Sequence, residues 1–179
     1  MVPPFRLSDL TWPQARDAAF EVAVLPWGAT EPHNTHLPYA TDTLLAEALA
    51  LEAGRLASAR GARVVVLPTI PFGANAMQLG LGPVIDLSPP TQRLVIADVV
   101  RSLEAAGVAR LAIVNAHGGN DFKPILREIQ GQTGIFLSAL DWWRTVPADD
   151  YFDTPGDHAG ELETSAMMHV RPDLVRPLA

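Results

Sequence analysis

The most informative absence in this sequence is cysteine, of which the 179-residue chain has none. That absence excludes disulfides, thiolate metal ligands and a cysteine nucleophile together. Basic residues are also scarce, since 13 Lys and Arg stand against 20 Asp and Glu and give a formal net charge of −7. A chain of this sign is a poor partner for nucleic acid or for an anionic membrane surface.

Long apolar runs and targeting signals are missing as well. No apolar stretch reaches the roughly 20 residues that span a bilayer, and the first residues lack the basic region and apolar run of a signal peptide. No G-x-S-x-G nucleophile elbow occurs. At 48% hydrophobic and 18% charged, the sequence predicts one globular, cytoplasmic domain over residues 1–179.

Short apolar runs alternate with longer amphipathic segments. We expect strands over Glu21–Trp27, Ala62–Pro68, Ala109–Asn115 and Gly134–Leu140. We expect helices over Thr43–Arg60, Pro90–Ala106 and Phe122–Gln130, with Thr41 or Asp42 capping the first and Ser88 the second. This alternation predicts an α/β fold with a mainly parallel sheet, because crossover helices join parallel strands.

The first polar cluster follows the first expected strand and reads Gly28-Ala-Thr-Glu31-Pro-His33-Asn-Thr-His36-Leu-Pro-Tyr-Ala-Thr-Asp42. Glu31 and His33 are two apart, so their side chains share one side of an extended segment. Taken singly, Asp42 is a helix cap, His36 a loop histidine and Glu31 a solvated acid. Imidazole with carboxylate is the ligand set of Zn²⁺, Mn²⁺ or Fe²⁺, so the cluster as a whole favours a metal site.

The second cluster follows the third expected strand and reads Asn115-Ala-His117-Gly118-Gly119-Asn120. Paired glycines let the backbone approach a ligand closely and present His117 and backbone N–H groups. Such a loop can also hold an anion at the start of a helix. A nucleotide site ranks lower, because the spacing is neither that of a dinucleotide-binding loop nor that of a P-loop.

The third cluster reads Gly156-Asp157-His158-Ala-Gly-Glu161-Leu-Glu163-Thr-Ser165. If it enters a helix, Asp157 is a candidate N-cap, and His158 and Glu161 lie on one face at a spacing of three. Glu163 then points elsewhere. Acids in a first helical turn also suit the helix dipole, but that simpler interpretation leaves the adjacent histidine unexplained.

In order and spacing, the three clusters resemble the creatininase (creatinine amidohydrolase) family. The resemblance runs from about Leu10 to Val175. It implies a three-layer α/β/α fold, two divalent metal ions per subunit and hydrolysis of a non-peptide C–N bond in a small molecule such as a cyclic amide or formamide. It also implies a homo-oligomer, commonly a hexamer.

By position, the resemblance implies that Glu31 and His117 hold one ion and His33 the other, with Asp42 bridging them. Creatininase has a further carboxylate just after the histidine of its second motif, where this sequence has Gly119. Many relatives with His-Gly-Gly carry an acid in the third motif instead.

For this fifth ligand the candidate is Glu161. His158 matches the family's substrate-contacting or acid/base histidine, and it would give a proton to the leaving nitrogen. Metal-activated hydroxide would attack the carbonyl, with N–H groups of Gly118 and Gly119 near the developing oxyanion. Further residues expected to touch substrate or support the ligands are His36, Asn120, Trp142 and Asp157.

Several departures from the family pattern concern the substrate side. Asn34 replaces a glycine, and Gly82–Ser88 stands where the family has Gly-Thr-Ile-Ser. The sequence ends at Ala179 where relatives continue, so the resemblance implies a short member or a trimmed end. The long apolar loops 68–83 and 139–156 are candidate pocket walls or contacts with a neighbouring subunit.

Two other functional classes stay open. One is a metal-free α/β module that uses the His-Gly-Gly loop to bind a small ligand or an anion, which elemental analysis would distinguish. The other is a structural or regulatory relative that has lost catalysis. Against the second, every expected type of ligand is present, with only the last carboxylate relocated.

Overall fold

The computed structural model describes residues 5–154 and 156–177. Its strands form one parallel sheet in the order β2-β1-β3-β4. They are β1 (Val22–Trp27), β2 (Val64–Val66), β3 (Arg110–Asn115) and β4 (Phe136–Asp141). The expected strands are thus all present, and the parallel sheet is confirmed.

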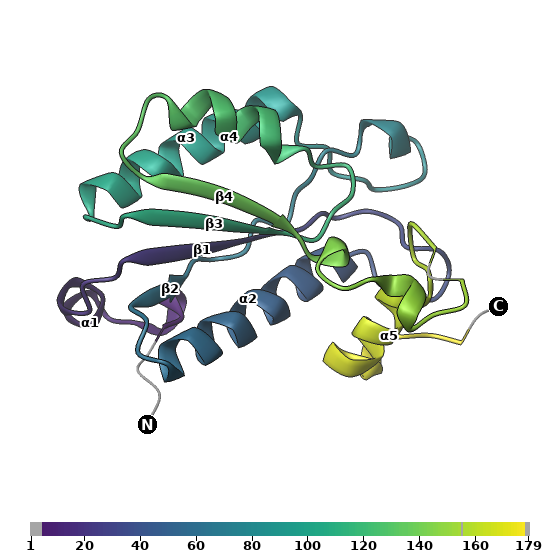
Figure 1. Cartoon of the computed structure of the whole chain (residues 1–179). Helices are drawn as coiled ribbons and strands as arrows, with labels where there is room; N and C mark the ends of the chain where they lie inside the picture. Colours follow the sequence, from purple (N-terminus) through teal and green to yellow (C-terminus); the bar gives the residue numbers. More distant parts are fainter. Residues whose placement is uncertain (1–4, 155, 178–179) are drawn as a thin grey trace.

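Helices cover both faces of this sheet and give the expected three-layer α/β/α arrangement (Figure 1). Helices α2 (Thr41–Ala59) and α5 (Glu161–Val170) lie on one face, and α3 (Pro89–Ala105) and α4 (Phe122–Gln130) lie on the other. A short helix that the pattern did not predict, α1 (Trp12–Asp17), precedes β1. Within the described ranges, no helix is long and apolar enough to cross a membrane.

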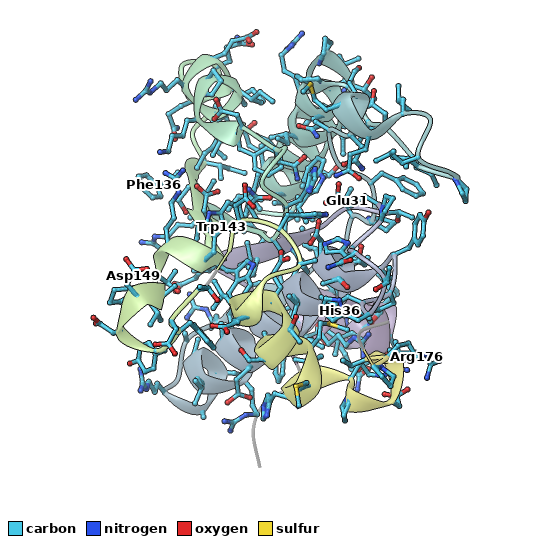
Figure 2. All side chains as sticks on the ribbon, turned by 90° about the vertical axis from the view of Figure 1, so that its right-hand side faces the viewer. Glu31, His36, Phe136, Trp143, Asp149 and Arg176 are labelled. Carbon is cyan, nitrogen blue, oxygen red and sulfur yellow. The ribbon has the colours of Figure 1, made fainter. Side chains whose placement is uncertain are left out.

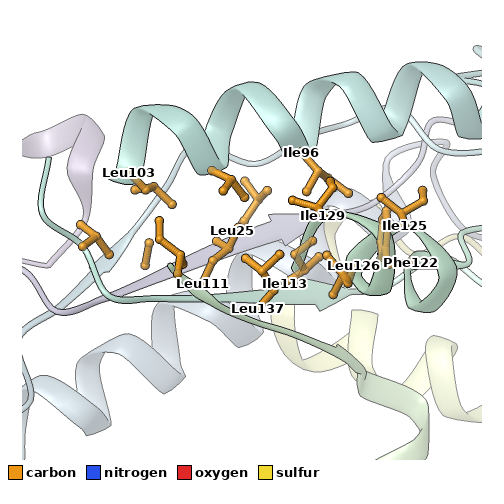
Figure 3. Close-up of a cluster of buried hydrophobic side chains, with 14 of the residues drawn as sticks. Leu25, Ile96, Leu103, Leu111, Ile113, Phe122, Ile125, Leu126, Ile129 and Leu137 are labelled. Atoms are coloured by element: carbon orange, nitrogen blue, oxygen red, sulfur yellow. The ribbon is translucent and has the colours of Figure 1, made fainter. Parts of the chain in front are cut away.

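Strands β1, β2 and most of β3 are buried because their aliphatic side chains alternate between two cores, whereas β4 at the edge is more exposed. Leu111 and Ile113 of β3 belong to the larger core, under α3 and α4, whereas Val114 belongs to the core on the other face. Figure 3 shows the larger core, in which the helices contribute Ile96, Leu103, Phe122, Ile125, Leu126 and Ile129. These contacts hold the carboxyl ends of the strands in place, and the polar clusters follow these strand ends.

The helix starts differ in part from expectation. Helix α2 begins at Thr41 with Ala40 as its N-cap residue, so neither Thr41 nor Asp42 caps it. The Thr41 hydroxyl instead donates to the carbonyl oxygen of Pro38 at 2.7 Å. Ser88 is the N-cap residue of α3, as expected.

The carboxyl ends of β1 and β3 lie side by side, since Trp27 pairs with Asn115. The chain leaves β1 towards α2 on one face of the sheet and leaves β3 towards α4 on the other (Figure 1). Such a switch point leaves a crevice at the edge of an open α/β sheet, where ligands usually bind. Here it brings the first two polar clusters together.

Candidate metal centre

Polar side chains from four separate segments converge beyond β1 and β3. Glu31 and His33 follow β1, Asp42 lies in the first turn of α2, His117 follows β3, and Glu163 lies in the first turn of α5. The first four are at most 5% exposed. Buried acids and histidines need charge partners, because burial removes the water that stabilises their ionised forms.

The carboxylate of Asp42 lies between two histidines. Its Oδ1 is 2.9 Å from Nε2 of His33, and its Oδ2 is 3.0 Å from Nδ1 of His117. Among the described residues, Oδ2 has no well-directed hydrogen bond although it is fully buried. A carboxylate whose two oxygens face different imidazoles is arranged to bridge two cations.

Two further carboxylates complete this arrangement. Oε1 of Glu31 is 2.9 Å from Nδ1 of His117. The potential ligand atoms of Glu31, Asp42 and His117 lie within 4.8 Å of one another, and so do those of His33, Asp42 and Glu163. A third such group contains Glu31, His33 and His158, so the cluster offers overlapping positions for a divalent ion.

Backbone carbonyls determine which ring nitrogen each histidine presents to the carboxylates. Nδ1 of His33 is 3.1 Å from the carbonyl oxygen of Glu31, and Nε2 of His117 is 3.0 Å from that of Ala74. A carbonyl oxygen only accepts, so these nitrogens are the ones that donate. The opposite nitrogens face the carboxylates, and metal-binding histidines usually have this kind of support.

The charges in this cluster shift one another's titration. Burial lowers the pKa of His117, but the hydrogen bonds and charges of Asp42 and Glu31 outweigh it and raise that pKa to about 10. The pKa of His33 is raised too, because the effect of Asp42 outweighs burial. Burial and the charge of Asp42 raise the pKa of Glu163. A divalent cation would therefore compete with protons for the two imidazoles.

The structure brings Glu163, rather than the expected Glu161, to the cluster. Oε2 of Glu163 accepts from the backbone N–H of Ala159, and the carboxylate lies near His33 and Asp42. Because 3.6 residues make one helical turn, side chains two positions apart point in nearly opposite directions. Only one of the two acids can face the cluster.

The start of α5 explains why Glu163, and not the expected Glu161, lies at the cluster. The N-cap residue is Gly160, so Asp157 lies before the helix and does not cap it. Glu161 is exposed, and its Oε2 accepts from the backbone N–H of Thr154 at 3.2 Å. Placing the N-cap at Gly160 from the sequence would have separated the two acids correctly.

His158 lies at the edge of the cluster. Its Nε2 donates to the carbonyl oxygen of Pro32 at 2.8 Å, and its Nδ1 is 3.9 Å from Oε1 of Glu31. The ring lies 4.5 Å from that of His33, between centroids. With 40% of its side chain exposed, His158 can reach a bound molecule.

A cavity of about 610 Å³ opens over the cluster, and His158 and Asp157 are among the residues that line it. Gly118 and Gly119 line it, as expected. Figure 2 looks onto this end of the molecule, where Trp143 and Glu31 lie across the cavity from one another. The tryptophan that lines it is Trp143.

Three of the residues expected to touch substrate or to support the ligands lie outside the cavity lining. Trp142 packs against the hydrophobic cluster that contains Ala116 and Met167. His36 is buried, with Nε2 2.8 Å from the hydroxyl of Thr164, and it lines a separate recess. Asn120 is buried behind the His-Gly-Gly loop and is absent from the cavity lining.

Asn120 is connected to His117 through the backbone of Ala74. Its Oδ1 accepts from the backbone N–H of Ala74 at 3.0 Å and from the side-chain amide of Gln92 at 2.7 Å. Ala74 in turn accepts from His117. Sequence reasoning did not single out Gln78, whose side-chain amide donates to Oε2 of Glu31. No local pattern marks such a residue, because its partner lies 47 positions away.

Known proteins with related sequences carry the names of enzymes. The mycofactocin precursor peptide peptidase of Mycolicibacterium smegmatis is 29% identical, over 85% of this chain and 59% of its own length. The creatinine amidohydrolase of Pseudomonas putida is 30% identical, over 94% of this chain and 73% of its own length. The chain thus spans about three fifths of the length of the peptidase.

Solved structures and a family model agree with these relatives. A creatinine amidohydrolase-like protein from Bacteroides fragilis matches 98% of this chain and 71% of its own, with a TM-score of 0.90 and 40% identity. A Zn–Zn form and a Mn form of creatininase have TM-scores of 0.78 and 0.80 at 27% and 26% identity, each over 96% of this chain and 74% of its own. The family model of creatininase, creatinine amidohydrolase, matches residues 8–179. The chain belongs to the creatininase family.

Proposed function

We propose that this protein is a divalent-metal-dependent amidohydrolase that cleaves a non-peptide C–N bond in a small molecule. The observation that supports this most is the carboxylate of Asp42 between His33 and His117, with 2.9 and 3.0 Å to their facing nitrogens. The reaction adds water to an amide. The C–N bond breaks, the water oxygen joins the carbonyl carbon, and the leaving nitrogen takes a proton.

Five side chains would hold two ions per subunit. Glu31 and His117 would bind one ion, His33 and Glu163 the other, and Asp42 both. When bound, such ions supply Lewis acidity and lower the pKa of water from about 16 towards about 7. Imidazole–carboxylate sites accept Zn²⁺, Mn²⁺ or Fe²⁺, and the Zn–Zn and Mn forms of creatininase support the first two.

The residues around the proposed ligands would donate a proton to the leaving nitrogen and stabilise the charge that develops on the carbonyl oxygen. Nε2 of His158 is anchored on the carbonyl oxygen of Pro32, so Nδ1 is the nitrogen that can pass a proton to the leaving nitrogen. The backbone N–H groups of Gly118 and Gly119 lie at the cavity wall. They would stabilise negative charge on the carbonyl oxygen. A homo-oligomer, a hexamer by family resemblance, and a cytoplasmic location stay predictions.

Metal analysis with a substrate screen tests this function. Elemental analysis should find about two divalent ions per chain, with less metal in Asp42→Ala and His117→Ala. Asp42→Asn keeps the shape of the side chain and replaces Asp42→Ala if that variant fails to fold. Circular dichroism checks the fold of each variant. The exposed His169→Ala is the matched control and should keep its metal.

The screen offers cyclic amides, formamides, small lactams and short peptides to the metal-loaded protein, and the product amine is detected directly. Short peptides are included because the M. smegmatis relative is a peptidase by name. Full metal occupancy in both ligand variants would refute the metal site. Metal binding without any hydrolysis would favour an inactive relative, and the absence of metal would favour an anion-binding module.

A further inference from the structure

Apart from histidines, the charged side chains that line the cavity above the cluster are acids, with one exception. Glu31, Asp42, Asp157 and Glu163 contribute carboxylates to it, whereas Arg144 is the single Lys or Arg side chain among the described lining residues. The four acids include three of the proposed ligands. Arg144 therefore provides the cavity's one permanent positive charge that lies apart from the ligand cluster.

The guanidinium of Arg144 is incompletely paired. Its Nε lies 3.6 Å from Oδ2 of Asp141, beyond hydrogen-bond range. The other oxygen of Asp141 accepts from the side-chain amide of Asn115 at 2.9 Å, which holds this acid at the end of β4. Across residues 5–154 and 156–177, no other hydrogen bond or ion pair of Arg144 is present.

The backbone that carries Arg144 is held in place, although the side chain is 66% exposed. Arg144 ends the short 3-10 helix η3 (Trp142–Arg144) directly after β4. The residue that follows closes this turn, because both the N–H and the hydroxyl of Thr145 donate to the carbonyl oxygen of Trp142, at 3.0 and 2.7 Å. The turn thus fixes the point on the cavity wall from which the Arg144 side chain extends.

Trp143 gives this part of the wall an apolar surface beside the charge. Trp143 and Arg144 line both the main cavity and a neighbouring recess of about 260 Å³. The recess also contains Lys123, with Asp121 and Asp141 as its acids. A group bound by Arg144 would lie between these two spaces, next to an aromatic side chain and away from the ligand cluster.

We propose that Arg144, beside Trp143, forms a subsite for a carboxylate on the substrate. The protein would then act on amides that carry a carboxylate separate from the C–N bond that is cleaved, such as N-acyl amino acids. This inference rests on the proposed function. The two terminal nitrogens of a guanidinium match a carboxylate with two parallel hydrogen bonds, which an ammonium group cannot do. The acids elsewhere in the cavity would repel the carboxylate, and this fixes the orientation of the substrate.

Matched substrates test the subsite in the metal-loaded full chain. N-formylglycine, N-formyl-β-alanine and N-formyl-γ-aminobutyrate are each compared with the corresponding carboxamide, so that the chain length scans the distance to Arg144. We expect kcat/KM to favour the acid about tenfold for one length, a modest factor because water screens an exposed charge. In Arg144→Gln the ratio of acid to carboxamide should fall about tenfold, and Arg144→Lys should restore part of it.

Arg101→Gln is the matched control, because Arg101 is an exposed arginine of α3 that is absent from the lining of the main cavity. A preference for the acid that survives in Arg144→Gln would overturn the subsite, since the carboxylate would then bind elsewhere. So would a preference for N-formylaminomethylphosphonate over every carboxylate.

Failure of this inference and failure of the proposed function give different results. Equal hydrolysis of acids and carboxamides would contradict the subsite alone. No metal-dependent hydrolysis of any compound, in this series or in the substrate screen, would contradict the proposed function. Calorimetric binding of N-acetylglycine and N-acetylglycinamide would then still test Arg144. Tighter binding of the acid than of the amide supports the subsite if Arg144→Gln abolishes this difference. Equal binding of the two compounds contradicts the subsite.

Discussion

The two walls of the cavity are built in different ways. The sheet wall consists of Glu31, Asp42 and His117, all buried and each in contact with at least one other member, and the buried His33, outside the cavity lining, contacts Asp42. The loop wall, residues 142–154 and 156–163, contains two short 3-10 helices and the first turn of α5, and many of its side chains are exposed. This difference suggests that the sheet wall holds most of the proposed metal ligands and that the loop wall supplies most of the contacts with the substrate, as is usual for rigid scaffolds with functional loops.

Glu163 tests this division between the two walls, because it is a proposed metal ligand that lies on the loop wall. In Glu163→Gln we expect one of two metal equivalents to be lost and hydrolysis to fall about a thousandfold, the upper range for removing one preorganised electrostatic group. Elemental analysis and initial rates measure the two effects.

Glu161→Gln is the control for this experiment, since it lies on the same helical turn and changes the same chemical group. It should keep both ions. Loss of metal in Glu161→Gln with full occupancy in Glu163→Gln would restore the ligand set that the sequence predicted.

The two glycines of the His-Gly-Gly loop, which lies beside the sheet wall, differ in how much space a side chain would have. A Cβ at Gly119 would collide with the carbonyl oxygen of Ala74 and with Nε2 of His117, whereas a Cβ at Gly118 would meet nothing within 4 Å. Gly119→Ala should therefore lower the free energy of unfolding by about 1–3 kcal/mol, as overpacking does. Gly118→Ala should change it little. Chemical denaturation measures both, and equal effects would contradict this account.

Gln78 tests whether a loop residue supports the sheet wall. Its amide donates to Oε2 of Glu31, so Gln78→Met should weaken metal binding about tenfold, the lower end for loss of an outer hydrogen bond to a ligand. Competition with a chelating dye gives the affinity. The neighbouring Met77 is 99% exposed, and Met77→Ala should bind metal like the parent protein. An unchanged metal affinity in Gln78→Met would show that Gln78 is not needed to position Glu31.

The pH dependence of the metal-free protein tests the charges around His117. His117 has a folded-state pKa of about 10, above the unfolded value of about 6.5. Its contribution to stability is therefore fully present below about pH 6.5 and is lost progressively as the pH rises through about 10. Urea unfolding of chelator-treated protein should show a falling midpoint over this range. The fall should be smaller in His117→Gln, and an equal fall would assign it to other groups.

Much of the fold could be predicted because its signals are local. Buried parallel strands leave aliphatic runs, and α4 was predicted with the bounds that it has, Phe122–Gln130. Helix α1 was missed because it has six residues, none of them buried, and so shows no apolar periodicity. The N-cap of α5 was misplaced because Asp157 is the better capping residue by type, whereas the chain before the helix places Gly160 there.

The sequence by itself determined the donor chemistry of this protein. Without cysteine, its clusters could offer only imidazole and carboxylate, and they follow strands whose ends must meet at one edge of a parallel sheet. Only the tertiary structure decided between neighbours: Glu163 over Glu161 for the cluster, and Trp143 over Trp142 for the cavity. Which of two nearby side chains faces the site depends on the rotation of α5 and on the turn after β4. Contacts with residues far away in the chain set both.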